Sequence, residues 1–155
     1  MGATNNNNMV LEATVIIVDN SKYAVNGDIL PSRFDAQTEA VNRLATAKLD
    51  ENQESAVGLM TMGGHNSEVL LTPVKEKSVI MAALSKVEVW GDSNLARAIM
   101  VASLSLKHRA NKNQRQRIIA MVSSPLKENL KELEAMGKKL SKNQIALDVI
   151  NLGIS

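Results

Sequence analysis

The run from Thr14 to Val18 constrains the fold of this chain more than any other stretch. It reads TVIIV and contains only β-branched residues, which is typical of a strand covered on both faces, as in a parallel sheet flanked by helices. Asp19 follows directly and so lies at the strand's carboxyl end, where open α/β sheets bind ligands and partners. Asp19, Asn20 and Ser21 are therefore the first candidate site, although such residues also form turns where a strand stops.

Strands and helices alternate along the rest of the sequence. Apolar runs predict three further buried strands and one short antiparallel return strand, over 56–62, 118–122, 145–152 and 68–71 respectively. Capping residues and helical periodicity predict four helices, from Pro31-Ser32 to about Leu49, from Thr72-Pro73 to about Leu84, from Ser93 to about Arg109 and from Pro125 to about Leu140. This order predicts an α/β fold with a doubly wound, mostly parallel sheet and one antiparallel edge strand, a Rossmann-like arrangement.

Length and composition narrow the classes of function. The 155 residues suit one domain, which we place at 9–155 after an Asn-rich extension or tag at 1–8 that we expect to be disordered. A net charge of +2 and only one Trp, one Tyr and one Phe argue against nucleic-acid and anionic-membrane partners. The sequence has no cysteine, which excludes disulfides and thiolate metal sites. No apolar segment approaches the roughly 18 residues of a membrane span.

Three polar features have ordinary structural explanations. The basic stretch 107–117 is short and contains no aromatic residue, so we expect a solvated helix end and loop in place of a nucleic-acid site. His65 and His108 lack the spacing of metal ligands. Gly63-Gly64 lacks the following Gly-Lys-Ser/Thr and the helix that a phosphate-binding loop requires.

Two single residues, Asp148 and Trp90, have expected structural roles, each with one alternative. Asp148 lies within the last predicted strand, where we expect it to make a polar contact at the strand edge. The alternative is that the Asp148 carboxylate supports the crevice from behind. Trp90 directly precedes Gly91 and is expected to anchor a loop or enter the core. An exposed contact for a partner protein is the alternative for Trp90.

Side-chain oxygens from three predicted loops converge on the crevice, namely those of Asp19 and Ser21, of Ser93 and of Ser124. These positions resemble the metal-ion-dependent adhesion site of von Willebrand factor A domains, which typically has Asp-x-Ser-x-Ser on the first loop, Thr on the second and Asp on the third. Here Tyr23 replaces the second Ser, Ser93 replaces the Thr and Ser124 stands in the place of the Asp. One carboxylate among hydroxyls is a poor cage for a hard cation, so we expect no metal and no cofactor.

Longer motifs carry a more specific resemblance. They are MVLEATVIIVDNS at 9–21, followed by Asn26-Gly27-Asp28, Arg33-Phe34 and Gln37, then LSLKHR at 104–109, QRQRIIAMVSSP at 114–125 and NQIALDVINLG at 143–153. Together they resemble the N-terminal von Willebrand factor A domain of the ubiquitin-receptor subunits of the 26S proteasome regulatory particle. The resemblance implies a cytoplasmic and nuclear, non-catalytic domain that bridges and stabilises lid and base subunits in ubiquitin-dependent protein degradation.

The same resemblance implies how partners are bound. The acid of the first loop, here Asp19, is implicated in docking in that family, and we expect Asn20 and Ser21 to take part. We expect Asp19 itself to accept hydrogen bonds from a partner, preferably from Lys or Arg. Ubiquitin chains are bound in the family by a helix that follows this domain, so we expect no ubiquitin binding through the sequence in hand. The segment 95–98 does not supply such a motif, because no acidic run precedes it and Ala102 stands where Ser is required.

Two other functions remain open at this point. Asp19 in an enzyme would act as a nucleophile for phosphoryl transfer, but that chemistry needs a second acid close by, and the DNS segment supplies none. We therefore predict that the chain is not an enzyme. The related A-domain subunit of the general transcription and DNA repair complex is the second alternative, and the complex that co-purifies with the chain would distinguish it.

Overall fold

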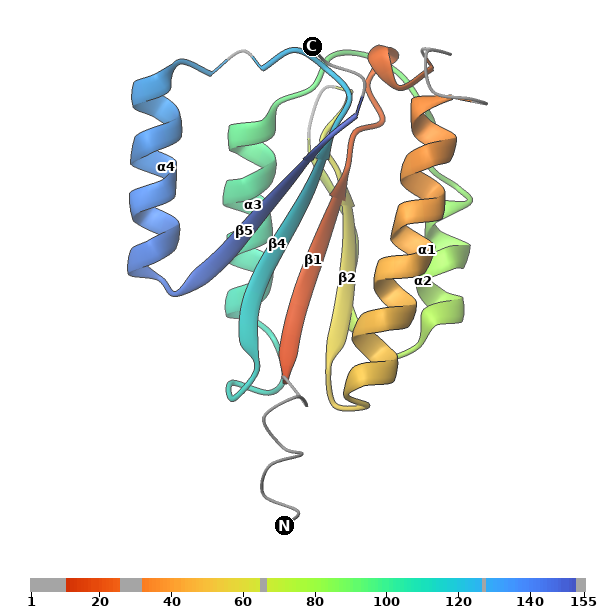
Figure 1. Ribbon diagram of the computed structural model, residues 1–155, viewed down its shortest axis with the longest axis vertical. Helices are drawn as coiled ribbons and strands as arrows, with labels where there is room; N and C mark the ends of the chain where they lie inside the picture. Colours follow the sequence, from red (N-terminus) through yellow and green to blue (C-terminus); the bar gives the residue numbers. More distant parts are fainter. Residues whose placement is uncertain (1–10, 26–31, 65–66, 127, 153–155) are drawn as a thin grey trace.

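The computed structural model describes residues 11–25, 32–64, 67–126 and 128–152 (Figure 1). The expected extension at 1–8, Pro31, His65 and Gly153 lie outside these ranges. The chain folds in the order β1 (Glu12–Val18), a short 3-10 turn (Lys22–Val25), α1 (Arg33–Glu51), β2 (Ala56–Thr61), β3 (Glu68–Val74), α2 (Lys77–Leu84), α3 (Leu95–Lys107), β4 (Arg115–Val122), α4 (Leu130–Lys142) and β5 (Ile145–Asn151).

The strands form one sheet in the order β3-β2-β1-β4-β5. β1 is parallel to β2 and β4, β4 is parallel to β5, and β3 is the antiparallel edge strand beside β2. The predicted α/β fold with a doubly wound, mostly parallel sheet is therefore confirmed. Because β1, β2 and β4 run in the same direction, their carboxyl ends lie at the same edge of the sheet (Figure 1).

Helices cover both faces of the sheet, with α1 and α2 on one face and α3 and α4 on the other (Figure 1). The alternation of side chains along β1 explains this arrangement. Val15 and Ile17 pack in the cluster that contains α3 residues, and Ile16 and Val18 pack in the cluster that contains α1 and α2 residues. All seven residues of β1 are buried, as its β-branched run predicts.

The predicted start of the first helix is confirmed, and two other predicted starts are wrong. Ser32 is the N-cap of α1, and its hydroxyl accepts a hydrogen bond from Asp35 N at 3.0 Å. Thr72 and Pro73 belong to β3, so α2 begins only at Lys77. The strand continues because Val74 still pairs with Val57 of β2.

The start of α4 also differs from the prediction. The helix begins at Leu130, and Asn129 is its N-cap, with the Asn129 side chain accepting from Glu132 N at 2.9 Å. Pro125 therefore lies in the loop after β4, where it follows the crevice residues. Within the described residues, no helix is both long and apolar enough to span a membrane.

Candidate functional site

Asp19 is the centre of the crevice at the carboxyl ends of the strands. Its side chain is fully buried, and its Oδ1 accepts a hydrogen bond from Ser21 N at 3.0 Å. Its Oδ2 accepts from Ser123 N at 2.7 Å and from Ser124 Oγ at 2.8 Å. The carboxylate thus joins the loop after β1 to the loop after β4.

Hydroxyl groups extend this connection to the loop before α3. Ser124 Oγ lies 2.5 Å from Ser93 Oγ, and both side chains are buried. The structure therefore brings together the four positions predicted from the sequence, Asp19, Ser21, Ser93 and Ser124. Ser21 is joined through its backbone N–H, while its buried hydroxyl has no hydrogen-bond partner within the described structure.

The donor set of this crevice does not fit a divalent cation. Among the four described positions of this site, Asp19 is the one carboxylate, and three N–H or O–H donors already point at its oxygens. No group of three or more His, Cys, Asp or Glu side chains that could hold a metal occurs among the described residues. A hard cation prefers several oxygen ligands that include carboxylates, whereas N–H and O–H groups of the protein already bind the Asp19 oxygens.

Gln37 carries part of the family resemblance but was missed as a site residue. It is fully buried on α1, where its Oε1 accepts from Asp19 N at 2.7 Å and its Nε2 donates to Asp19 O at 2.9 Å. The same Nε2 donates to Ser123 Oγ at 3.1 Å. The signal in the sequence was a polar residue on the buried face of α1, four residues before Val41.

Arg33 is the second missed residue, four residues before Gln37 on the same face of α1. It is 7% exposed, and its Nη1 donates to Ser123 O at 2.5 Å. A buried guanidinium must have acceptors, and the crevice loop supplies this one. The first turns of α1 therefore hold both loops that Asp19 joins.

Asn20 connects the first loop to two neighbouring segments. Its Oδ1 accepts from Gly63 N at 2.6 Å, and its Nδ2 donates to Glu88 O at 2.9 Å. Its backbone carbonyl accepts from Trp90 N at 2.8 Å. Lys22 N donates to Gly91 O at 2.8 Å, so segment 88–91 is fixed against the first loop.

Trp90 is half exposed beside this crevice, with 47% of its surface accessible. Its ring lies close to Gly64, where a Cβ would come within 2.7 Å of ring carbons. The expected loop-anchoring contact is therefore present, but entry into the core is not. The indole also borders a groove of about 650 Å³ between β3 and α2 that Asn20 lines as well.

The close contact between Gly63 and the first loop yields a testable prediction. A Cβ at position 63 would lie 2.5 Å from Asn20 Oδ1 and 2.6 Å from Ser21 N. Because Ser21 N belongs to the backbone, it cannot move without shifting the loop. We expect Gly63→Ala to lower the free energy of unfolding by about 2 kcal/mol.

Urea denaturation followed by circular dichroism measures this effect. Gly137→Ala is the matched control, because a Cβ at this α4 position has no heavy atom within 4 Å. Alanine is the better helix former, so the control should be as stable as the original chain or slightly more stable. Equal stability of Gly63→Ala and Gly137→Ala would contradict the observed packing of the crevice.

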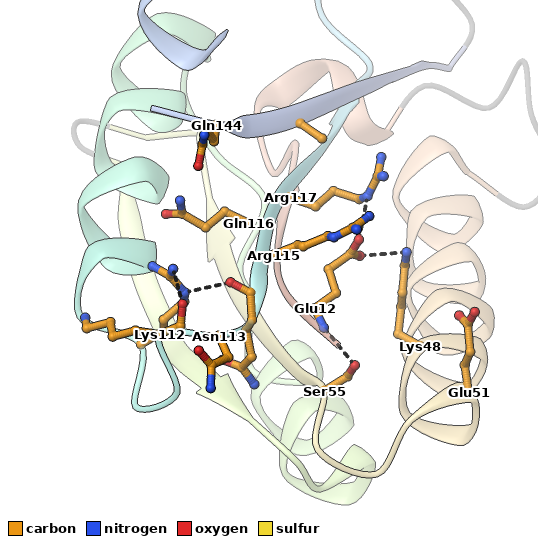
Figure 2. Close-up of a pocket in the computed structure, with 13 residues that line it drawn as sticks. Glu12, Lys48, Glu51, Ser55, Lys112, Asn113, Arg115, Gln116, Arg117 and Gln144 are labelled. Carbon is orange, nitrogen blue, oxygen red and sulfur yellow. Dashed lines mark hydrogen bonds and ion pairs between the residues drawn. The ribbon is translucent and has the colours of Figure 1, made fainter. Parts of the chain in front are cut away.

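A buried ion network lies at the opposite, amino-terminal edge of the sheet (Figure 2). The Glu12 carboxylate accepts from Lys48 Nζ at 2.7 Å, Arg117 Nε at 3.1 Å and Thr14 Oγ1 at 2.7 Å. Arg117 also pairs with Asp148 at 2.6 Å, so Asp148 makes a polar contact on edge strand β5. Burial alone would raise the pKa of Glu12, but the hydrogen bonds from Lys48, Thr14 and Arg117 outweigh it and lower this pKa.

Known proteins are similar to this chain in sequence and fold. The family model of the von Willebrand factor type A domain matches residues 14–125. The 26S proteasome non-ATPase regulatory subunit 4 homolog of Oryza sativa subsp. japonica is 52% identical over 145 residues, which make up 94% of this chain and 36% of that protein. The 26S proteasome regulatory subunit RPN10 of Saccharomyces cerevisiae is 45% identical over 145 residues, which make up 94% of this chain and 54% of that protein.

A solved structure agrees with these matches. The crystal structure of the SpRpn10 VWA domain superposes with a TM-score of 0.91 and 41% sequence identity, covering 94% of this chain and 77% of that chain. The chain thus spans about a third to a half of the full length of the two curated relatives. The resemblance to the A domain of the proteasome subunit is confirmed by these matches. The chain belongs to the von Willebrand factor type A domain family.

Proposed function

We propose that this domain is a non-catalytic part of a 26S proteasome regulatory subunit, in the cytoplasm and nucleus, and that it bridges lid and base subunits in ubiquitin-dependent protein degradation. The names of its relatives support the proteasome over the general transcription and DNA repair complex. The observation that carries a binding role is the rigidly held crevice. Asp19 joins two of its loops, and Ser124 joins a third through its contact with Ser93.

Asp19, Asn20 and Ser21 serve docking in this proposal by positioning the loops. All three are buried, with exposures of 5% or less, so a partner reaches the surface that they hold in place. That surface includes the half-exposed Trp90 and the exposed Lys22. Half-exposed tryptophans that become buried on binding commonly contribute a large share of the binding energy at protein interfaces.

Burial also weighs against catalysis by Asp19. A nucleophile for phosphoryl transfer must reach the phosphorus atom, whereas the Asp19 oxygens are enclosed and accept three hydrogen bonds from the protein. The proposal accordingly includes no reaction, no metal and no cofactor. It also includes no nucleic-acid or membrane partner and no ubiquitin binding by this domain.

Reconstitution with isolated lid and base subcomplexes tests the proposed function. The chain should increase the co-sedimentation of lid with base, and Trp90→Ala should weaken its binding at least tenfold at temperatures where the variant is still folded. Val149→Ala is the matched control, because Val149 is 49% exposed on the distant edge strand β5. A folded chain that associates with neither subcomplex would refute the proposal, and equal binding by both variants would remove Trp90 from the interface.

A further inference from the structure

The helices α3 and α4 cover the same face of the sheet (Figure 1). Residues of both helices line an apolar groove of about 680 Å³. Its interior contains buried Ile99 and Leu140. Met100 and Leu104 line it with 57% and 52% of their surfaces exposed. These two side chains are four residues apart and hence neighbours on one side of α3, so the groove presents a continuous apolar strip to solvent.

One end of this groove is strongly basic. Four cations but only one acid, Glu132, line the groove among the described residues; the cations are Lys107, Arg109, Lys112 and Lys139. Arg109 and Lys112 donate to backbone carbonyls, and no carboxylate pairs with any of the four within the described chain. The carboxyl ends of two helices offset about one unit of positive charge, so a clear excess remains.

The basic region continues beyond the groove. The polar cavity of about 650 Å³ at the amino ends of the strands (Figure 2) shares Arg109, Lys112 and Gln116 with the groove. Arg115 adds a further exposed cation there. Glu12 and Glu51 also line this cavity, but its five cations outnumber them, so positive charge extends beyond this end of the groove.

We infer that the α3–α4 groove binds an acidic amphipathic helix of a partner protein. α3 has 13 residues and is about 20 Å long, so a helix of roughly the same length fits alongside it. Apolar side chains at i, i+3 or i+4 and i+7 would cover Met100 and Leu104, and acidic residues at one end would pair with Lys107 and Lys139. A second copy of this chain is a poorer occupant, because it would bring the same cations into contact.

This inference is independent of the crevice, since the basic end of the groove lies at the opposite edge of the sheet. A synthetic helical peptide with leucines at i, i+4, i+7 and i+11 and glutamates on both flanks is the probe. The control peptide has the same leucines but lysines in place of the glutamates. Titration of isotope-labelled protein followed by NMR should show shifts at Met100, Leu104 and Lys107, with the acidic peptide binding at least tenfold more tightly and losing affinity as salt increases.

Three variants make the test specific. Leu104→Glu should weaken binding of the acidic peptide at least tenfold, and the double variant Lys107→Glu with Lys139→Glu should reverse the preference between the peptides. Arg43→Glu is the control, because Arg43 is an exposed cation on α1. No binding of either peptide, equal binding of both, or shifts confined to other surfaces overturns the inference. Self-association that Leu104→Glu abolishes would also overturn it and assign the groove to a second copy.

Discussion

Replacing Asp19 with alanine will lower the free energy of unfolding by about 3 to 5 kcal/mol. The change leaves three buried donors, Ser21 N, Ser123 N and Ser124 Oγ, without their acceptor. Each buried donor that loses its partner costs about 1 to 3 kcal/mol, and water entering the new space offsets part of the sum. Urea denaturation of both proteins at neutral pH measures the difference.

Two further variants give this prediction a sharp control. Asp19→Asn keeps the shape of the side chain but presents an NH₂ group to donors, so it should lose at least half as much stability as the alanine variant. Asp50→Ala removes an exposed acid near the end of α1 and should change stability by less than about 0.5 kcal/mol. A wild-type unfolding curve for Asp19→Ala would show that these hydrogen bonds contribute nothing.

The same variant separates the two roles of Asp19. If the crevice loops dock lid or base subunits, Asp19→Ala should weaken that association at temperatures where the variant is still folded, because Asn20 and segment 88–91 lose their fixed position. Unchanged affinity in a destabilised Asp19→Ala protein would leave the acid with a role in loop structure alone. The affinity for lid and base subunits and the free energy of unfolding should therefore both be measured on Asp19→Ala.

The order of the elements was predictable because it depends on local pattern. The β-branched run of β1 indicated a central strand, and Ser32 with Asp35 indicated the start of α1. The predicted start of α2 was wrong because a Thr-Pro pair is typical of a helix start. In this fold Pro73 lies in an edge strand opposite Gly58. A Cβ on Gly58 would come within 3.1 Å of Pro73 N, so the glycine permits this close approach. The pairing of Pro73 with Gly58 involves two separate strands, so the residues next to Pro73 in the sequence do not indicate it.

In the candidate site too, some contacts could be predicted from the sequence and others could not. Parallel topology alone brings the ends of β1 and β4 together, which is why Asp19 and Ser124 could be predicted as neighbours. The roles of Gln37 and Arg33 depend on how α1 is rotated on the sheet, and helical periodicity indicates a buried face without naming its contacts. Glu12 was missed because its partners, Lys48 and Arg117, lie far away in the sequence and on different elements.

Glu12 provides the second large effect. Glu12→Gln keeps the size of the buried side chain but removes its charge, so Lys48 loses its carboxylate partner and Arg117 keeps only Asp148. We expect a loss of about 3 kcal/mol of unfolding free energy at pH 7, at the low end for a broken buried pair because both cations keep some exposure to solvent. Urea denaturation at several pH values measures it.

The dependence on pH follows from the lowered pKa of Glu12 in the folded chain. Because the pKa of Glu12 is lower in the folded than in the unfolded chain, its charge stabilises the fold fully at pH values above the unfolded-state pKa of about 4.3. This stabilisation is lost as the pH falls through the lower pKa of the folded state. The stability difference between the original chain and Glu12→Gln should therefore be constant at neutral pH and shrink in strong acid. Glu39→Gln is the control, since the exposed Glu39–Arg43 pair is worth at most about 0.5 kcal/mol. A difference for Glu12→Gln that persists unchanged into strong acid would mean that its charge is not what stabilises this edge of the sheet.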